Sequence, residues 1–183
     1  YETANTEIAS ATVASAQEAG WTWDIGLQTR RGVGYTYSNA HTNDDDAERV
    51  LRDYIARTHN KAAAHESDIR KISFTPGYRE QFWVNNCLAI GMFAGFFEPL
   101  EASALAMVEL SLTMLTDEFP VDRDHMLMLS KRFNSRFTYR WQRVVDFLKL
   151  HYLFNSRQQA YWQDAKHERS VPDSLKELLE LWK

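Results

Sequence analysis

Two carboxylates three residues apart, Glu98 and Glu101, are the residues of this sequence best suited to chemistry. They follow an apolar run that contains Gly91 and Gly95, where the backbone could approach a flat molecule. Pro99 and the small residues after Glu101 predict the first turn of a helix. The N–H groups of such a turn can hold an anion or a phosphate-bearing cofactor, and a carboxylate beside it could accept a proton.

The same glutamates also have a purely structural interpretation, which the residues alone favour. Carboxylates that share a face at the start of a helix are stabilised by its dipole, by about 0.3–1 kcal/mol each. Their apolar neighbours shift the balance slightly, because a carboxylate among Phe96, Phe97 and Leu100 needs a partner or a purpose.

The sequence gives little support for a metal site or for a serine or cysteine nucleophile. No two of the six histidines have the spacing of zinc ligands on one helix face, and no serine lies in a nucleophile elbow. The consecutive carboxylates Asp44, Asp45 and Asp46 favour a solvated helix start over a metal site. The single cysteine, Cys87, excludes an internal disulfide and suits a reducing compartment. Its apolar neighbours favour a buried small side chain over a nucleophile.

The elements that would position these residues form an α+β fold, mostly α-helical, with a short antiparallel β part before a helical C-terminal part. Alternation predicts a pair of strands over residues 20–38, with Trp21, Trp23 and Ile25 on one buried face. Residues 3–18 suit either a strand or a helix. Residues 61–66 are predicted to be a hydrophilic connection, and residues 69–84 a further strand pair that closes the small sheet.

Helical spacing governs the remaining segments. One helix is predicted to begin at Thr42 or Asn43, and another, buried on all sides, covers residues 101–115. A long helix over residues 122–154 and a final one after Pro172 follow. The long helix carries aromatic and aliphatic residues that favour core packing over a cofactor site: Phe133, Phe137, Trp141, Val145, Phe147 and Leu148.

Length and composition fit one domain over residues 1–183, with a strand-containing part (1–100) and a helical part (101–183). A formal net charge of -4 and scattered basic residues argue against a nucleic-acid partner. No apolar run approaches the roughly 20 residues of a membrane span, so a soluble, cytoplasmic protein is expected. The chain has neither an initiator methionine nor a targeting segment, which favours a fragment of a longer polypeptide.

Two stretches of the chain resemble the flavin-dependent tryptophan halogenases. The first is made of Asn86-Cys87, Ala89-Ile90-Gly91, Ala94-Gly95-Phe96 and Glu98-Pro99-Leu100-Glu101. The second, Gly20-Trp21-Thr22-Trp23-Asp24-Ile25, is similar to the family signature Trp, any residue, Trp, any residue, Ile, Pro, although Gly26 stands at the proline. The resemblance implies the C-terminal portion of a larger flavin-monooxygenase-like α/β enzyme. Such an enzyme chlorinates or brominates an indole or tryptophan-like aromatic with reduced FAD, oxygen and halide.

The resemblance also implies roles for particular residues. Glu101 would be catalytic, reaching the substrate and assisting electrophilic substitution. Chloride or bromide would lie at Ser103 and Ala104, and no metal is implied. Flavin contacts would fall at Met92, Gly95 and Leu105, and substrate contacts at Tyr161 and Trp162 besides Glu101. The main FAD-binding segment and the catalytic lysine are expected upstream of Tyr1, so this portion alone is expected to be inactive.

Departures from the family pattern bear on the substrate. The chain has Glu101-Ala102-Ser103-Ala104 where the family usually has Glu-Ser-Thr-Gly, so a serine hydroxyl beside the catalytic glutamate is lost. It has His151-Tyr152 near the place of a tyrosine pair, and it lacks the carboxylate that would meet an ammonium group. The missing carboxylate weakens free tryptophan as the substrate.

The implied partners are a small aromatic substrate, a flavin reductase that supplies reduced flavin, and the missing N-terminal part of the same protein. A homodimer is left open. Two alternatives stand beside the halogenase interpretation: a flavin-dependent aromatic monooxygenase and a non-catalytic helical interaction module.

Overall fold

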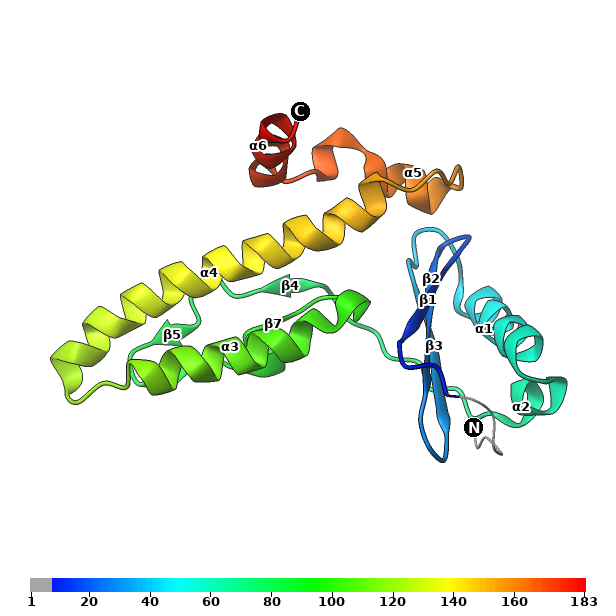
Figure 1. Ribbon diagram of the computed structural model, residues 1–183, viewed down its shortest axis with the longest axis horizontal. Coiled ribbons are helices and arrows are strands. Elements are labelled where there is room, and N and C mark those ends of the chain that lie inside the picture. The colour runs from blue at the N-terminus through cyan, green and yellow to red at the C-terminus, as the bar shows by residue number, and fades with distance from the viewer. Residues whose placement is uncertain (1–7) are drawn as a thin grey trace. The chain divides into compact units, whose positions relative to one another are not determined.

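The computed structural model describes residues 8–183, which fall into two compact units (Figure 1). Within the described residues, unit 1 contains residues 8–72 and Asn155–Ser170, and unit 2 contains Ser73–Phe154 and Val171–Lys183. The chain passes from one unit to the other after residues 72, 154 and 170. The short strands of residues 77–96 belong to unit 2, because they pack with its helices.

Unit 1 is built on an antiparallel sheet of order β1-β2-β3. The strands are β1 (Val13–Gln17), β2 (Gly20–Gly26) and β3 (Arg31–Tyr37). The strand pair predicted for residues 20–38 is confirmed. The open choice for residues 3–18 resolves as a strand at β1, while residues 1–7 lie outside the described residues.

The face of β2 that carries Trp21, Trp23 and Ile25 was predicted to be buried, but only part of it is buried. Trp21 is buried, but Trp23 is half-buried over Gly34 and Ile25 is 37% exposed. The residues between them, Thr22 and Asp24, are 0% and 2% exposed. The prediction of one buried apolar face on β2 is therefore wrong.

Hydrogen bonds explain why the polar residues of β2 can be buried. Arg31 donates to both oxygens of Asp24 at 2.5 Å, and the Tyr54 hydroxyl donates to the same carboxylate at 3.1 Å. The Thr22 hydroxyl donates to the Ser15 carbonyl at 3.2 Å. A buried charge is tolerated when it is paired in this way.

Helices complete unit 1. Helix α1 (Asp44–Thr58) begins after Asn43, one of the two predicted caps, whose side chain accepts from the Asp46 N–H. Residues 61–66 form α2 (Lys61–Glu66) and not a hydrophilic connection, because the Asn60 side chain caps this short helix and Ala64 is buried on α1. Helix α5 (Ala160–Lys166) and the 3₁₀ turn η3 (Glu168–Ser170) follow.

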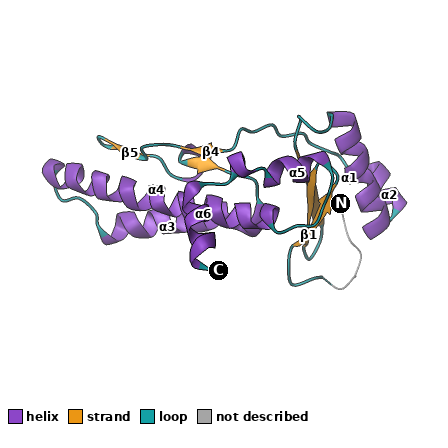
Figure 2. Ribbon diagram, turned by 90° about the horizontal axis from the view of Figure 1, so that it is seen from above, coloured by secondary structure: helices purple, strands orange, loops and turns teal. Residues whose placement is uncertain are grey.

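Unit 2 contains α3 (Ser103–Asp117) and α4 (Arg123–Leu153), which lie antiparallel side by side, and α6 (Asp173–Leu181) (Figures 1 and 2). Four two-residue strands lie in the segment before α3: β4 (Gly77–Tyr78), β5 (Trp83–Val84), β6 (Cys87–Leu88) and β7 (Gly95–Phe96). Strand β4 pairs with β7, and β5 pairs with β6. The predicted pairing within residues 69–84, closing the small sheet, is therefore wrong.

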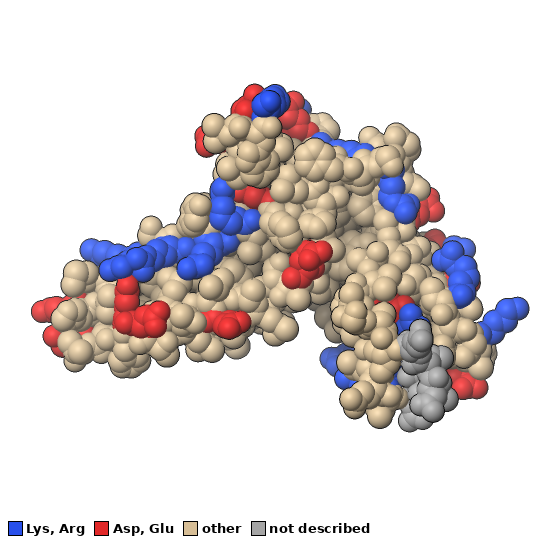
Figure 3. Space-filling view, in the orientation of Figure 1, with Lys and Arg blue, Asp and Glu red and all other residues tan. Residues whose placement is uncertain are grey.

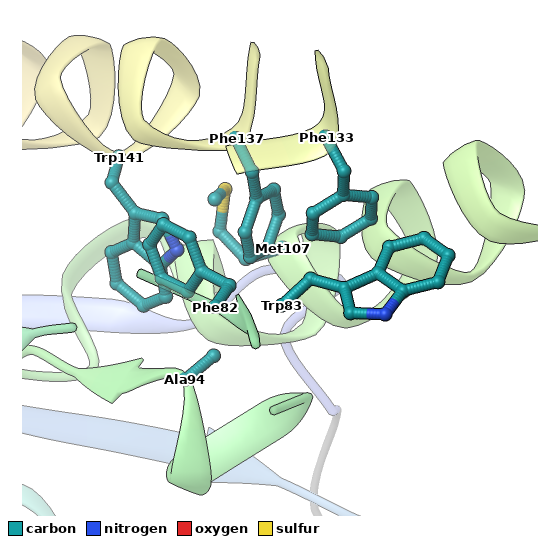
Figure 4. Close-up of a cluster of buried hydrophobic side chains, with 7 residues drawn as sticks. All are labelled: Phe82, Trp83, Ala94, Met107, Phe133, Phe137 and Trp141. Atoms are coloured by element: carbon teal, nitrogen blue, oxygen red, sulfur yellow. The ribbon is translucent and has the colours of Figure 1, made fainter. Parts of the chain in front are cut away.

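The core of unit 2 is an aromatic cluster along α4 (Figure 4). The rings of Phe133, Phe137 and Trp141 meet Phe82 and Trp83; the Phe82 and Phe137 ring centroids lie 4.7 Å apart, nearly edge to face. Such aromatic pairs add about 0.5–1.5 kcal/mol beyond area burial. The prediction of core packing for this stripe is confirmed.

Other side chains of unit 2 differ from the predictions. Leu148 is buried, but Phe147 is 45% exposed because it lies on a different side of α4. Cys87 is exposed, since its two-residue strand lies at the surface. Helix α3 is not buried on all sides: among its described residues only Met107 and Ser111 are buried.

One polar side chain fastens the segment before α3 onto α4. The Asn134 amide oxygen accepts from the backbone N–H groups of Phe82 and Trp83, at 2.9 and 2.8 Å, and its nitrogen donates to the Trp83 carbonyl. Backbone groups that lack a ladder partner are thereby satisfied.

Basic residues gather along α4 on the face shown in Figure 3. Arg132 and Arg136 both pair with Glu118, at 2.9 and 3.2 Å, so part of this charge is neutralised locally. Across residues 8–183, no helix has the length and apolar character needed to cross a membrane.

The aromatic cluster generates a stability prediction. Phe137 is 1% exposed, so Phe137→Ala should lower the free energy of unfolding of the full-length protein by about 3–5 kcal/mol through lost contacts and a residual cavity. Urea unfolding measures the change. Phe119→Ala is the control, because Phe119 is 70% exposed. Equal effects from the two substitutions would contradict the core assignment.

Candidate functional site

The segment between Pro99 and Ser103 has an unusual backbone. Glu101 (φ 60°, ψ 19°) and Ala102 (φ 51°, ψ 26°) both adopt left-handed conformations and are the last two residues of the 3₁₀ turn η2 (Leu100–Ala102). Residues other than glycine pay roughly 1 kcal/mol or more for this conformation. Helix α3 therefore begins at Ser103. Because Glu101 lies before the helix, the predicted shared helical face for Glu98 and Glu101 is wrong.

Glu98 has a partner on α4. The Tyr152 hydroxyl donates a hydrogen bond to the Glu98 carboxylate, and both side chains are at least partly buried. The Tyr152 hydroxyl is therefore the polar partner that the Glu98 carboxylate needs in its apolar surroundings. It also joins the segment before α3 to the last turn of α4.

Glu101 faces the neighbouring residue of that turn. Its Oε1 lies 3.7 Å from Nε2 of His151, and its side chain is 52% exposed. The His151 Nδ1 lies 3.0 Å from the Phe147 carbonyl oxygen, and the Phe147 ring meets the imidazole edge to face at 4.9 Å. The sequence does not indicate that His151 and Tyr152 lie beside the two glutamates, because a separation of about fifty positions carries no local signal.

Ser103 and Ala104, the predicted halide residues, are the first two residues of α3. The capping residue Ala102 offers no side-chain acceptor, and the Ser103 hydroxyl is turned back to the Leu100 carbonyl at 3.4 Å. The N–H groups of this first turn thus receive no side-chain cap. Such a helix start can accept an anion from outside.

Two of the three predicted flavin residues are strongly exposed. Met92, in the 3₁₀ turn η1 (Gly91–Phe93), and Leu105, on α3, are 79% and 76% exposed, and η1 packs on α3. A glycine at position 95 is required by packing alone, because a Cβ there would lie 2.6 Å from the Cβ of Tyr78 in the paired strand β4. Its contact with flavin stays a prediction.

Tyr161 and Trp162, the predicted aromatic clamp, belong to unit 1, whereas Glu101 belongs to unit 2. Trp162 is 5% exposed, and its indole N–H donates to the Gln17 carbonyl at 2.7 Å, so it fastens α5 to β1. The Tyr161 ring is half-buried and meets His41 edge to face at 5.6 Å. Of the pair, Tyr161 has the more accessible ring.

A histidine that the sequence did not single out links the turn after β3 to α5 in unit 1. His41 lies with Nδ1 2.9 Å from the Ser38 hydroxyl and with Nε2 2.8 Å from the Asp164 carboxylate. This contact supports the position of α5, next to Tyr161. Among the residues that the structure describes, no group of three or more His, Cys, Asp or Glu side chains could hold a metal ion.

Comparison with known proteins identifies the family. The family profile described as tryptophan halogenase matches residues 1–183. The chain belongs to the tryptophan halogenase family. A solved tryptophan halogenase from Shewanella frigidimarina NCIMB 400 is 50% identical, with a TM-score of 0.92, over 100% of this chain and 34% of that one.

Two further relatives agree with this assignment. The tryptophan 6-halogenase SttH of Streptomyces toxytricini is 38% identical over 94% of this chain and 32% of its own length. The solved structure of BrvH, a flavin-dependent halogenase from Brevundimonas sp. BAL3, is 35% identical with a TM-score of 0.86, over 99% of this chain and 36% of that one. The chain thus spans about one third of the length of these relatives.

The Tyr152–Glu98 contact of this chain can be tested directly. Tyr152→Phe removes a donor from a partly buried carboxylate and should lower the free energy of unfolding by about 1–3 kcal/mol. Chemical denaturation of the full-length protein measures the loss. Tyr139→Phe is the matched control on α4, because Tyr139 is 59% exposed. A loss no larger for Tyr152→Phe than for the control would show that the contact contributes nothing.

Proposed function

We propose that the full-length protein carrying this chain is a flavin-dependent halogenase that chlorinates or brominates an indole or another electron-rich aromatic compound. One observation supports this most strongly. In a chain of the tryptophan halogenase family, Glu101 lies on a left-handed turn directly before a helix start that no side chain caps. A carboxylate and an anion-accepting helix end thus lie within a few residues of each other.

Glu101 is assigned the catalytic role. Electrophilic substitution on an aromatic ring develops positive charge and then releases a proton, and a carboxylate can stabilise the charge and accept the proton. The structure supports this role because Glu98 is engaged by the Tyr152 hydroxyl whereas half of the Glu101 side chain is accessible. Glu98 is assigned a structural role.

Ser103 and Ala104 are assigned to the halide. The positive end of the α3 dipole and the uncapped N–H groups of its first turn favour an anion there. The small side chains of Ala102 and Ala104 leave room for it to approach. The Ser103 hydroxyl can reach the halide by rotating away from the Leu100 carbonyl. That hydrogen bond is long, at 3.4 Å, and therefore weak.

The flat flavin ring of reduced FAD is proposed to lie beside this turn. Met92 and Leu105 present exposed apolar side chains on elements that pack together, which suits the edge or face of such a ring. When bound, the flavin supplies the oxidising chemistry that turns chloride or bromide into an electrophilic halogen. The residues of this chain would bind and orient the ring, with Gly95 as a further backbone contact.

The substrate is proposed to be an aromatic compound other than free tryptophan. Tyr161 offers a ring for stacking, while Trp162 supports it from the core of unit 1. The Tyr152 hydroxyl, which lies near the place of the family's tyrosine pair, is directed to Glu98 and not to a substrate head group. A flavin reductase, the rest of the same polypeptide and a cytoplasmic location complete the proposal.

Mass spectrometry of products tests this function. The full-length protein is incubated with a flavin reductase, FAD, NADH, oxygen, bromide and a panel of indoles. We expect a product heavier by one bromine in place of hydrogen. Glu101→Gln should lower its rate of formation about 10²- to 10⁴-fold, the usual contribution of a positioned base, without weakening FAD binding. Glu109→Gln, at an exposed residue of α3, is the control.

Other outcomes would decide against the proposal. A product that gains oxygen, formed equally well without bromide or chloride, would identify the monooxygenase alternative. Absence of any product together with absent FAD binding by the full-length protein would favour the interaction module. Full activity of Glu101→Gln would remove the role assigned to that residue.

A further inference from the structure

We infer that His151 is a positioning residue for Glu101, and that it holds the carboxylate only when its imidazole ring carries two protons. The inference rests on the proposed function, because it takes Glu101 as the group that reaches the substrate. It assigns to His151 a role that neither the sequence pattern nor the family resemblance supplied.

Hydrogen-bond chemistry fixes the tautomer. The Phe147 carbonyl can only accept, so the 3.0 Å contact with it places a proton on Nδ1 of His151. In the neutral ring, Nε2 then has a lone pair and no proton. That lone pair faces Oε1 of Glu101, 3.7 Å away, which is also an acceptor. Attraction between the two side chains therefore requires a second proton on the ring.

The surrounding structure makes the contact specific. The Phe147 ring holds the imidazole edge to face, at a centroid distance of 4.9 Å, so Nε2 keeps its direction. The left-handed backbone at Glu101 fixes the origin of its side chain, but that side chain is 52% exposed and its outer bonds can rotate. A charged imidazole would restrict the carboxylate to one orientation.

Other charged groups near this turn have different assignments. Glu98 comes from the segment before η2 and is engaged by Tyr152, so it does not replace Glu101 at the ring. Lys149 is the nearest cationic residue along α4, two positions earlier, and burial lowers its pKa. In helical geometry, residues two apart point in different directions. His151 is the residue of α4 whose ring nitrogen lies against the Glu101 carboxylate.

The sign of the pH dependence follows. The pair forms only with the doubly protonated ring, so acid favours the contact and alkali removes it. The contribution of His151 to the halogenation rate should therefore be present in mildly acidic solution and disappear as the pH rises.

The test compares the full-length protein with His151→Asn between pH 5.5 and 8.5, with reductase in excess and bromination of an indole as the readout. We expect wild type to exceed the variant about three- to fivefold in kcat at the acidic end, as for a partly exposed ion pair, and less than twofold at the alkaline end. Reduced-flavin oxidation should be equal in the two proteins. His151→Lys places a side chain that stays cationic between pH 5.5 and 8.5 at this position. This variant should therefore keep, at every pH tested, the rate that wild type shows at the acidic end.

His125→Asn is the matched control. His125 is also on α4 and also lies beside a carboxylate, with Nδ1 3.6 Å from the Asp122 oxygen, but at the opposite end of the helix. It should leave the profile unchanged. The same measurement on His151→Gln serves if His151→Asn does not fold.

The outcomes separate the two claims. A wild-type to variant ratio that is constant with pH, while Glu101→Gln is inactive, would overturn the inference about His151 and leave the proposed function intact. Full activity of Glu101→Gln would overturn both. A ratio that falls with rising pH only for His151 substitutions supports the inference.

Discussion

The packing of one long helix determines how unit 2 is arranged. Helix α4 carries a row of aromatic side chains along its buried side, and the irregular segment before α3 wraps over that row through Phe82 and Trp83. Asn134 satisfies the backbone of the same segment. About five turns further along α4 than Asn134, Tyr152 engages Glu98. A single rigid element therefore fixes both the core and the turn that precedes α3.

This arrangement explains how a strained turn can persist. Two consecutive left-handed residues without glycine cost free energy, and they are retained only when the surrounding structure determines the backbone on both sides. Here Glu98 is tied to α4 before the turn, and α3 packs against α4 after it, with Met107 in the shared core. The strain lies at Glu101, the residue to which we assign the catalytic role, and strained backbone tends to occur at functional sites.

Regular elements with local signals could be predicted from the sequence. The Asn43 cap, the long helix α4 and the strand pair of residues 20–38 each depend on near neighbours in the sequence, and the structure confirms them. The buried apolar face expected on β2 is not confirmed. Helix α2 was missed because a polar six-residue segment lacks a clear apolar stripe, although Asn60 and the alanines after it were a usable signal. The pairing of β4 with β7 depends on contacts distant in sequence.

The candidate site was predictable in part. The motif around Glu101 led to the right family, and Ser103 and Ala104 do begin a helix. The left-handed backbone of Glu101 and Ala102 had no signal, since neither residue type favours that conformation. The burial of Asp24 and the neighbours of Glu101 on α4 arise from tertiary pairing. Sequence patterns report which face of an element is apolar, not which distant partner satisfies a charge.

The central claim is that the turn before α3 presents a carboxylate and a halide site side by side. Its most direct test is the anomalous scattering of bromide in crystals of the full-length protein grown with FAD and bromide. The account predicts a bromide peak within hydrogen-bond reach of the N–H groups at Ser103 and Ala104, next to the flavin and the Glu101 carboxylate. Bromide bound only elsewhere, with the start of α3 packed against other protein atoms, would contradict it.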